Sequence, residues 1–115
     1  QVTRAFADHL APRAKVALIT SRMGSIGDND SGSNYGYRMS KAALNAAGKS
    51  LALDLAARGV AVGILHPGFV RTEMTQRRGH VEPAEAAAML VERIDALEPE
   101  TAGRFFHANG EELPW

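Results

Sequence analysis

Two residues of the chain have the chemistry of a proton donor and its helper, namely Tyr37 and Lys41. They lie four residues apart at the start of an expected long helix, residues 34–58, so their side chains project from one face, a turn apart. A lysine ammonium near a phenol favours the phenolate form, which makes a tyrosine usable as a general acid or base. The pair alone is a weak signal, because many helices carry Tyr and Lys at this spacing by chance. The segments before and after the pair indicate whether it is a catalytic pair or a chance one.

A serine precedes this helix at the end of an apolar segment. Residues 15–20 form a short run rich in strand-forming residues, which predicts a buried parallel strand, and Ser21 follows directly. Ligands of open α/β sheets bind at the carboxyl ends of the strands. The plain alternative is a serine that merely ends a strand, and Ser25 is a competing candidate because it is nearer to Tyr37 in sequence. The position at the strand end favours Ser21.

A second apolar run, residues 60–65, predicts another buried strand and is followed by a Pro-Gly turn and a threonine. Pro67 and Gly68 form the turn, and Val70 and Thr72 come next. A glycine lets the backbone approach a ligand closely, because it has no side chain. The structural alternative is an ordinary Pro-Gly turn between two elements.

The order of these features resembles the short-chain dehydrogenase/reductase family: a strand and serine, a Tyr-x-x-x-Lys helix, and a strand with Pro-Gly-x-x-x-Thr. The local sequence over residues 24–26, 36–45 and 66–68 is most similar to that of the C-factor and sniffer-like carbonyl reductase branch of the family. The resemblance implies a Rossmann-type fold and NAD(P)-dependent reduction of a carbonyl, or oxidation of an alcohol, by hydride transfer. A small-molecule carbonyl or alcohol would be the substrate.

The resemblance also implies a role for each candidate residue. Ser21 would orient the substrate carbonyl, Tyr37 would supply the proton, and Lys41 would assist Tyr37 and hold the ribose hydroxyls of the cofactor. The shelf for the nicotinamide ring would consist of Pro67, Gly68, Val70 and Thr72.

No glycine-rich dinucleotide turn follows a strand in this sequence. Members of the family carry such a turn ahead of the serine, where the start of a helix binds the pyrophosphate. The glycines between Ser21 and Tyr37 do not have the spacing of a phosphate cradle. We therefore expect the carboxyl-terminal half of such an enzyme, with residues 1–115 forming a single partial domain. The sequence does not decide between NAD and NADP.

Composition narrows the remaining function classes. At 115 residues the chain has room for one domain, and its formal net charge of zero gives no reason to expect nucleic acid as a partner. There are no cysteines, which agrees with a cytoplasmic location, and no apolar run is long enough to span a membrane. The four histidines lack metal-ligand spacing, so no metal site is expected; they are His9, His66, His80 and His107.

Helices that alternate with short apolar strands predict an α/β fold with a parallel sheet of three strands. The expected elements are a helix to about residue 10, strands over 15–20, 60–65 and 104–107, and helices over 34–58 and 83–97. Right-handed crossovers would place both connecting helices on one face of the sheet. The other face and the edge of the first strand would stay bare, which predicts a homo-oligomer. The rival interpretation is a truncated, catalytically silent fragment that self-associates.

Overall fold

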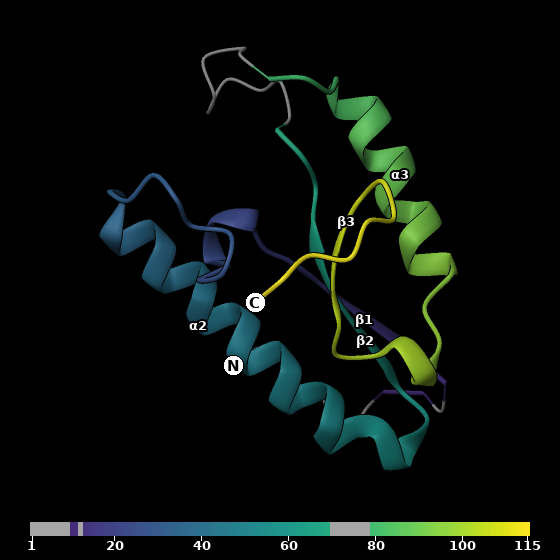
Figure 1. The fold of residues 1–115 in the computed structure, drawn as a ribbon. Coiled ribbons are helices and arrows are strands. Elements are labelled where there is room, and N and C mark those ends of the chain that lie inside the picture. Colours follow the sequence, from purple (N-terminus) through teal and green to yellow (C-terminus); the bar gives the residue numbers. More distant parts are fainter. Residues whose placement is uncertain (1–9, 12, 70–78) are drawn as a thin grey trace.

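The computed structural model describes residues 10–11, 13–69 and 79–115 as three strands with helices on either side (Figure 1). Short 3-10 helices, labelled η, interrupt the loops. In chain order the elements are β1 (Lys15–Ile19), η2 (Arg22–Gly24), α2 (Tyr35–Leu55), η3 (Ala56–Arg58), β2 (Ala61–His66), α3 (Pro83–Asp95), η4 (Pro99–Thr101) and β3 (Phe105–His107). The expected helix before residue 10 lies outside the described residues. The other expected helices and strands are confirmed to within a few residues.

The sheet is parallel throughout, with the strand order β1-β2-β3. In its register Ile19 lies beside Leu65, and His66 lies beside His107. Because all three strands run in one direction, their carboxyl ends form one edge. Ser21 and Pro67 follow the strands at that edge, as the sequence predicted.

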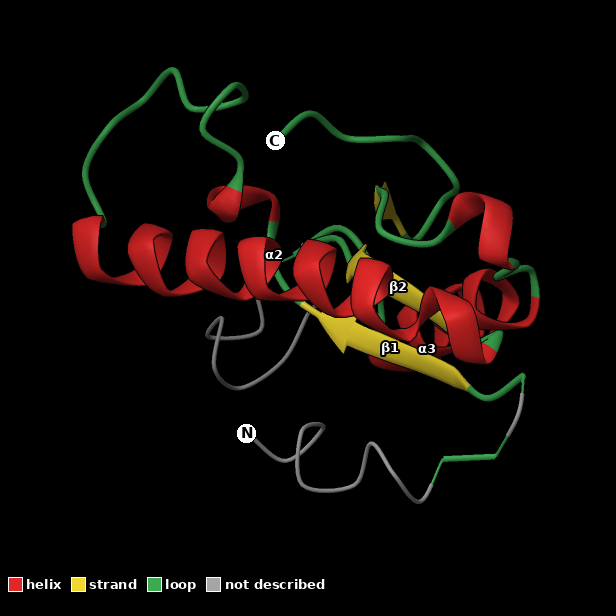
Figure 2. Ribbon diagram, turned by 90° about the horizontal axis from the view of Figure 1, so that it is seen from below, coloured by secondary structure: helices red, strands yellow, loops and turns green. Residues whose placement is uncertain are grey.

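Helix α2 is much longer than the strands that it covers, and Figure 2 shows it extending well beyond the end of the sheet. The side-chain hydroxyl of Thr20 donates to the carbonyl oxygen of Lys41 at 3.5 Å, which places the Lys41 turn at the end of β1. The turn that carries Tyr37 is therefore part of the overhang. At the other end the helix passes into η3 and stops at Gly59, whose φ of 71° is the left-handed cap expected there.

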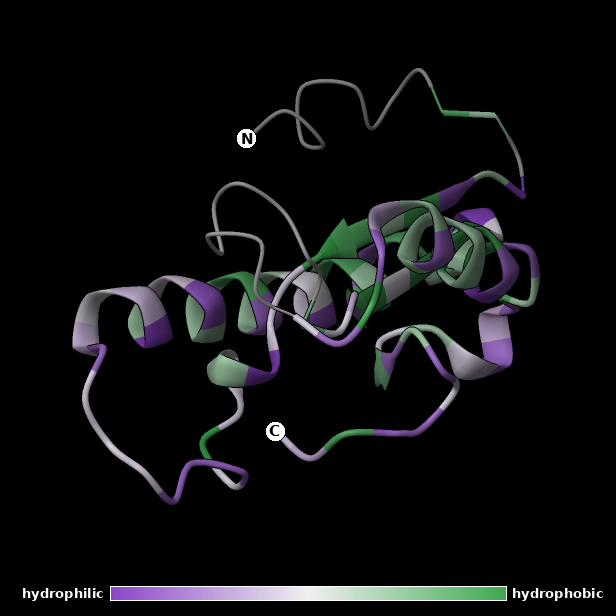
Figure 3. Cartoon of the chain, turned by 90° about the horizontal axis from the view of Figure 1, so that it is seen from above, coloured by the Kyte–Doolittle hydropathy of each residue, from purple (hydrophilic) through white to green (hydrophobic). Residues whose placement is uncertain are grey.

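A missing side chain lets α2 lie close to the sheet. A Cβ atom at Gly48 would lie 2.8 Å from carbons of Ile64 and 3.0 Å from Leu18 Cδ1. Beside this contact, α2 and the strands form a buried apolar cluster, which consists of Ala52, Leu55, Val60 and Val62. Figure 3 colours the strands as hydrophobic, whereas α2 carries both hydrophobic and hydrophilic stripes. The core therefore lies between α2 and the sheet.

Leu97, just after α3, covers the opposite face. A Cβ atom at Gly63 would lie 2.8 Å from Leu97 Cδ1, and Gly63 and Ile64 point to opposite faces of β2 because they are adjacent in a strand. The amino group of Lys15 also donates to the carbonyl oxygen of Asp95, at the end of α3, at 2.7 Å. In Figure 1, α2 and α3 accordingly lie on opposite sides of the strands.

The expectation that both crossover helices share one face was therefore wrong. The strand order advances in one direction, from β1 to β2 and then to β3, whereas the two connecting helices lie on opposite faces of the sheet. The two crossovers thus have opposite hands, and the general preference for right-handed crossovers does not hold for one of them. The second face of β2 is consequently covered from within the chain.

The carboxyl-terminal segment folds back over β3. Leu113 donates its N–H to the carbonyl oxygen of Phe105 at 2.7 Å and is buried with Phe105 and Ile64. The Trp115 ring stacks on Phe105, with 5.5 Å between the ring centroids. This segment gives β3 an apolar cover on the α2 side. Among the helices in the described residues, none is both long and apolar enough to cross a membrane.

Candidate active site

Tyr37 and Lys41 project together from the overhanging end of α2. The ammonium nitrogen of Lys41 lies 5.5 Å from the centroid of the Tyr37 ring. Tyr37 is 47% exposed, so its hydroxyl can be reached from solvent, whereas Lys41 is half-buried. The helical spacing thus brings the ammonium group of Lys41 close to the Tyr37 ring, which stays partly exposed.

Ser21 lies at the carboxyl end of β1 and starts the next element. Its backbone is extended, with φ −151° and ψ 146°, and its side-chain oxygen accepts the N–H of Met23 at 3.1 Å, which caps η2. Ser25 instead ends η2, is only 2% exposed, and accepts the N–H of Asp28 at 3.0 Å. Ser21 is itself buried, at 8% exposed, so burial does not separate the two serines, and Ser21 differs in its place directly after β1.

Close packing joins the Ser21 turn to the Lys41 turn. A Cβ atom at Gly24 would lie 2.8 Å from the carbonyl carbon of Lys41 and 2.9 Å from its oxygen. Only a glycine allows η2 to lie this close to α2. Together with the Thr20 hydrogen bond, this contact brings the elements carrying Ser21, Tyr37 and Lys41 to the same end of the sheet.

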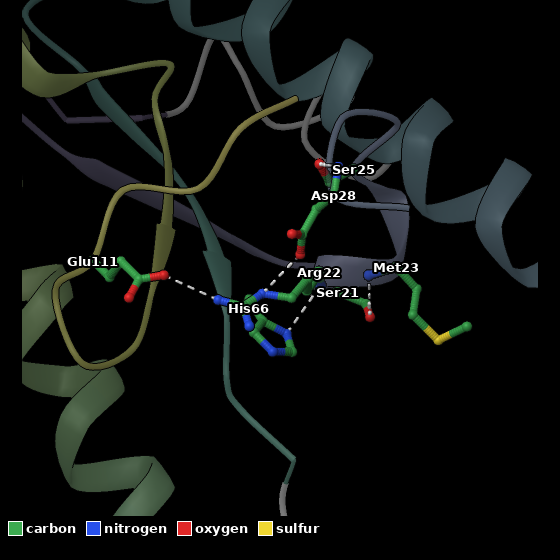
Figure 4. A network of polar contacts seen from close by, with 7 residues as sticks. All are labelled: Ser21, Arg22, Met23, Ser25, Asp28, His66 and Glu111. Atoms are coloured by element: carbon green, nitrogen blue, oxygen red, sulfur yellow. Dashed lines mark hydrogen bonds and ion pairs between the residues drawn. The ribbon is translucent and has the colours of Figure 1, made fainter. Parts of the chain in front are cut away.

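A polar network that the sequence analysis did not anticipate surrounds Arg22 (Figure 4). Its backbone N–H donates to Nδ1 of His66 at 3.1 Å. Its guanidinium donates to Glu111 at 3.1 Å and forms an ion pair with Asp28 at 3.2 Å. The network ties the segment after β1 to the end of β2 and to the carboxyl-terminal segment.

His66 and His107 meet at this edge, edge to face, with 5.1 Å between the ring centroids. Burial, together with the charges of His107 and Arg22 and against an opposing effect of Asp28, lowers the pKa of His66 to about 4. Burial also lowers the pKa of His107, with Arg22 acting in the same direction and Glu111 against it. Both rings are therefore neutral near pH 7. Within the described residues, no cluster of histidine and carboxylate side chains could hold a metal ion.

A sequence signal for the histidine pair did exist. Each histidine is the last residue of an apolar run, and the ends of neighbouring parallel strands meet at one edge. The sequence analysis of the histidines considered only metal-ligand spacing, which does not bear on a contact between two rings. The bond from Arg22 could not have been foreseen, because it depends on the path of the backbone after β1.

The turn after β2 holds a glycine in a left-handed backbone conformation. Gly68 has a φ of 91°, which favours glycine, and a Cβ atom there would lie 3.5 Å from the His107 ring. Pro67 and Gly68 are half-buried at the carboxyl edge. The two other residues predicted for the shelf, Val70 and Thr72, lie outside the described residues.

A comparison with known families shows where the chain belongs. The family model described as short chain dehydrogenase matches residues 1–83. The chain belongs to the short-chain dehydrogenase family. Among curated relatives of this family, 1-hydroxy-2-glutathionyl-2-methyl-3-butene dehydrogenase of Rhodococcus sp. (strain AD45) is 49% identical over 106 residues, which cover 89% of this chain and 47% of the relative. C-signal of Myxococcus xanthus is 45% identical over 101 residues, 88% of this chain and 61% of the relative.

Solved short-chain dehydrogenase structures agree with this assignment. Carbonyl reductase Sniffer of D. melanogaster superposes with a TM-score of 0.85 at 34% identity, over 96% of this chain and 46% of that one. A short-chain dehydrogenase/reductase from Burkholderia multivorans with bound NADP gives a TM-score of 0.87 at 30% identity, over 99% and 49%. The Rossmann-like fold predicted from the sequence is therefore confirmed. The chain spans about half the length of the relatives that it matches.

Proposed function

We propose that this chain forms the catalytic part of an NAD(P)-dependent oxidoreductase that interconverts a small-molecule carbonyl and an alcohol. The single observation that carries the proposal is the contact between Lys41 and Tyr37 at the end of the sheet where the Ser21 turn packs. A phenol beside an ammonium group, open to solvent, is suited to donate a proton and to stay charged afterwards. The oxidoreductases among its relatives support the same reaction class.

The described residues suit the nicotinamide and ribose end of a dinucleotide. Lys41 offers a cation to ribose hydroxyls, and the backbone of Pro67 and Gly68 follows β2 at the carboxyl edge of the sheet. No glycine-rich turn for the pyrophosphate follows β1 or β2, so the described residues do not fit the phosphate end. NADP is bound in the Burkholderia multivorans relative, and we propose NAD or NADP for this protein.

The residues of the chain divide the reaction between them. A nicotinamide held beside Lys41 and Gly68 would supply the hydride chemistry at the carbonyl carbon. In the reductive direction, the Tyr37 hydroxyl donates its proton to the carbonyl oxygen, so that the C=O group becomes CH–OH. Lys41 stabilises the phenolate that remains. Ser21 accepts the N–H of Met23 and so keeps its own proton free to donate to the carbonyl oxygen, which polarises the carbonyl.

An alternative is that residues 1–115 by themselves are catalytically silent and self-associate. The missing phosphate cradle favours it for the isolated chain, since a dinucleotide gains much of its affinity there. Calorimetry with NAD(H) and NADP(H) separates the two cases. Binding should be weak or undetectable with the isolated chain and should appear when a dinucleotide-binding segment precedes it.

The test of the proposed function is Tyr37→Phe, with Tyr35→Phe as its matched control. Tyr35 lies on the same helix and is 80% exposed, so its hydroxyl is at least as accessible as that of Tyr37 but lies two residues away from the proposed position. Both variants belong in a protein that carries the dinucleotide-binding segment of the family ahead of this chain, such as a chimaera with the Rhodococcus relative.

We expect Tyr37→Phe to lower kcat for carbonyl reduction by at least about 100-fold, the usual scale for a general acid. Tyr35→Phe should keep wild-type activity, and circular dichroism should show both variants folded. Reductase activity that survives Tyr37→Phe would refute the assignment.

A further inference from the structure

The side chain of His66 continues the pairing of β1 and β2 beyond the end of their strand ladder. The register of the two strands ends with Ile19 beside Leu65, and the N–H of Thr20 still donates to the carbonyl oxygen of Leu65 at 2.8 Å. Two residues later the N–H of Arg22 donates to Nδ1 of His66 at 3.1 Å. A side-chain nitrogen thus takes the place of a backbone carbonyl in the pairing.

Ser21 lies between these two anchors. The amide before it and the amide after it are both held by β2, through Leu65 and His66. Its own hydroxyl oxygen is directed to the N–H of Met23. The extended backbone of Ser21 is thus held on both sides, and on the Arg22 side the acceptor is the side chain of residue 66 (Figure 4).

We propose that His66 is a positioning residue of the active site, because its Nδ1 fixes the Arg22 amide and thereby the orientation of Ser21. The inference rests on the proposed function, in which Ser21 polarises the substrate carbonyl. His66 itself touches neither the substrate nor the reacting atoms in this role. It acts through the backbone of the turn.

The surroundings of His66 keep its Nδ1 available as an acceptor. The charged and titratable groups that face it are His107 from β3, Arg22 from η2 and Asp28 from the loop after η2. Burial holds its pKa near 4, so at neutral pH the ring is neutral, and the Arg22 bond requires the tautomer with its proton on Nε2. The Arg22 guanidinium is meanwhile engaged by Asp28 and Glu111.

Two amide substitutions distinguish an acceptor at the Nδ1 position from a merely polar side chain. In His66→Asn, Oδ1 stands about where Nδ1 was, whereas in His66→Gln, Oε1 reaches the position of Nε2. His107→Asn serves as a control, because it removes the ring that packs on His66 and keeps an acceptor for the N–H of Asn109. All three variants are made in the same chimaera as Tyr37→Phe.

We expect His66→Gln to lower kcat about tenfold, with little change in KM, because the Arg22 amide loses its partner. His66→Asn and His107→Asn should stay within about threefold of the wild type, since both keep the acceptor at residue 66. Amide hydrogen exchange at Arg22, followed by NMR, should be at least about tenfold faster in His66→Gln than in His66→Asn.

Equal activity and equal Arg22 exchange in the two amide variants would overturn the positioning role, whether both are high or both are low. That result is separate from a failure of the proposed function. The latter would appear as an inactive wild-type chimaera or as an active Tyr37→Phe variant.

Discussion

Close backbone contacts set part of the geometry of individual residues at this site. Gly24 is the clearest case, because its missing Cβ allows η2 to lie against the Lys41 turn of α2. The buried amide of Asn45 lies on the same contact, 2.8 Å from where that Cβ would be. The position of the Ser21 turn relative to Lys41 therefore depends on one absent methyl group.

Gly24→Ala is expected to destabilise the fold by about 1–3 kcal/mol, the range for an added methyl group that its surroundings cannot accommodate. The added carbon would meet backbone atoms of a helix, which cannot move aside as a flexible side chain would. Gly27→Ala is the matched control, because its Cβ would lie at an ordinary 3.6 Å from Pro114. Urea denaturation of the two variants and the wild type measures the difference. Equal stability of Gly24→Ala and the wild type would contradict the packing described here.

His66 should make the stability of the protein depend on pH. Its pKa is about 4 in the fold against an ordinary value of 6.5, so between these values the unfolded chain binds more protons than the folded one. The contribution of His66 to the free energy of unfolding is then at its full value above about pH 6.5 and is lost as the pH drops toward 4. The lowered pKa of His107 acts in the same direction.

Between pH 7 and 5, we expect the contribution of His66 to fall by about 1–2 kcal/mol, discounted because the ring is partly exposed. Urea denaturation at both pH values, compared with His66→Asn, isolates it. The variant cannot titrate at this position, so its stability should fall less with acid. Parallel pH dependence of the two proteins would show that His66 does not titrate in this way.

The sequence could predict where the candidate residues lie better than the contacts that support them. Tyr37 and Lys41 are placed by helical spacing alone, and Ser21 by the end of an apolar strand, so local patterns suffice for all three. The Arg22–His66 bond joins two segments far apart in sequence, and it exists only because β1 and β2 are neighbours in this register. Such support follows from tertiary structure, which no local pattern contains.

At the scale of elements, α2 combines a core-facing side with the overhang that carries Tyr37 and Lys41. Its glycines have different roles on this helix. Gly48 lies against Ile64 and Leu18, whereas a Cβ at Gly36 would have no atom within 4 Å outside its own helix. One glycine is required by packing, and the other is only a flexible residue in a helix.

Gly48→Ala should therefore destabilise the fold by about 1–3 kcal/mol, while Gly36→Ala should leave it unchanged or stabilise it by up to about 1 kcal/mol. The first adds a methyl group where Ile64 already lies at 2.8 Å, and the second only restricts the unfolded chain. Thermal denaturation followed by circular dichroism compares the pair. The reverse order of stability would mean that α2 is not packed on the sheet as described.

The side of the sheet on which α3 lies could not be read from the sequence. The preference for right-handed crossovers is a statistical rule about parallel strands, and it predicted one shared face. In the structure Gly63 leaves room for Leu97 on the opposite face of β2. A glycine inside an apolar strand was a hint that something approaches closely there, but it did not say which element.

At the scale of the whole molecule, the reasons to expect self-association change. The sheet face that was expected to be bare is covered by Leu97, and the carboxyl-terminal segment covers β3. Within the described residues, the far edge of β1 pairs with no other strand, and α2 keeps an exposed side. The residues along that side follow one another at alternating intervals of four and three, which is the spacing of a seam where two helices pack. It consists of Met39, Ala43, Ala46, Ser50 and Leu53.

We expect the chain to form a homo-oligomer through this seam, with two-fold symmetry as the simplest arrangement. Met39 and Leu53 are 69% and 65% exposed at its two ends, and the small residues between them would let a second helix approach closely. Light scattering at micromolar concentration should give a mass above that of a monomer. The double variant Met39→Glu/Leu53→Glu should lower that mass, because it buries like charges in the contact. Val91→Glu, at a 56% exposed position on α3, should not change it. A compact wild-type monomer with a cooperative thermal transition would contradict this prediction. It would show that neither the exposed side of α2 nor the open edge of β1 needs a partner in water.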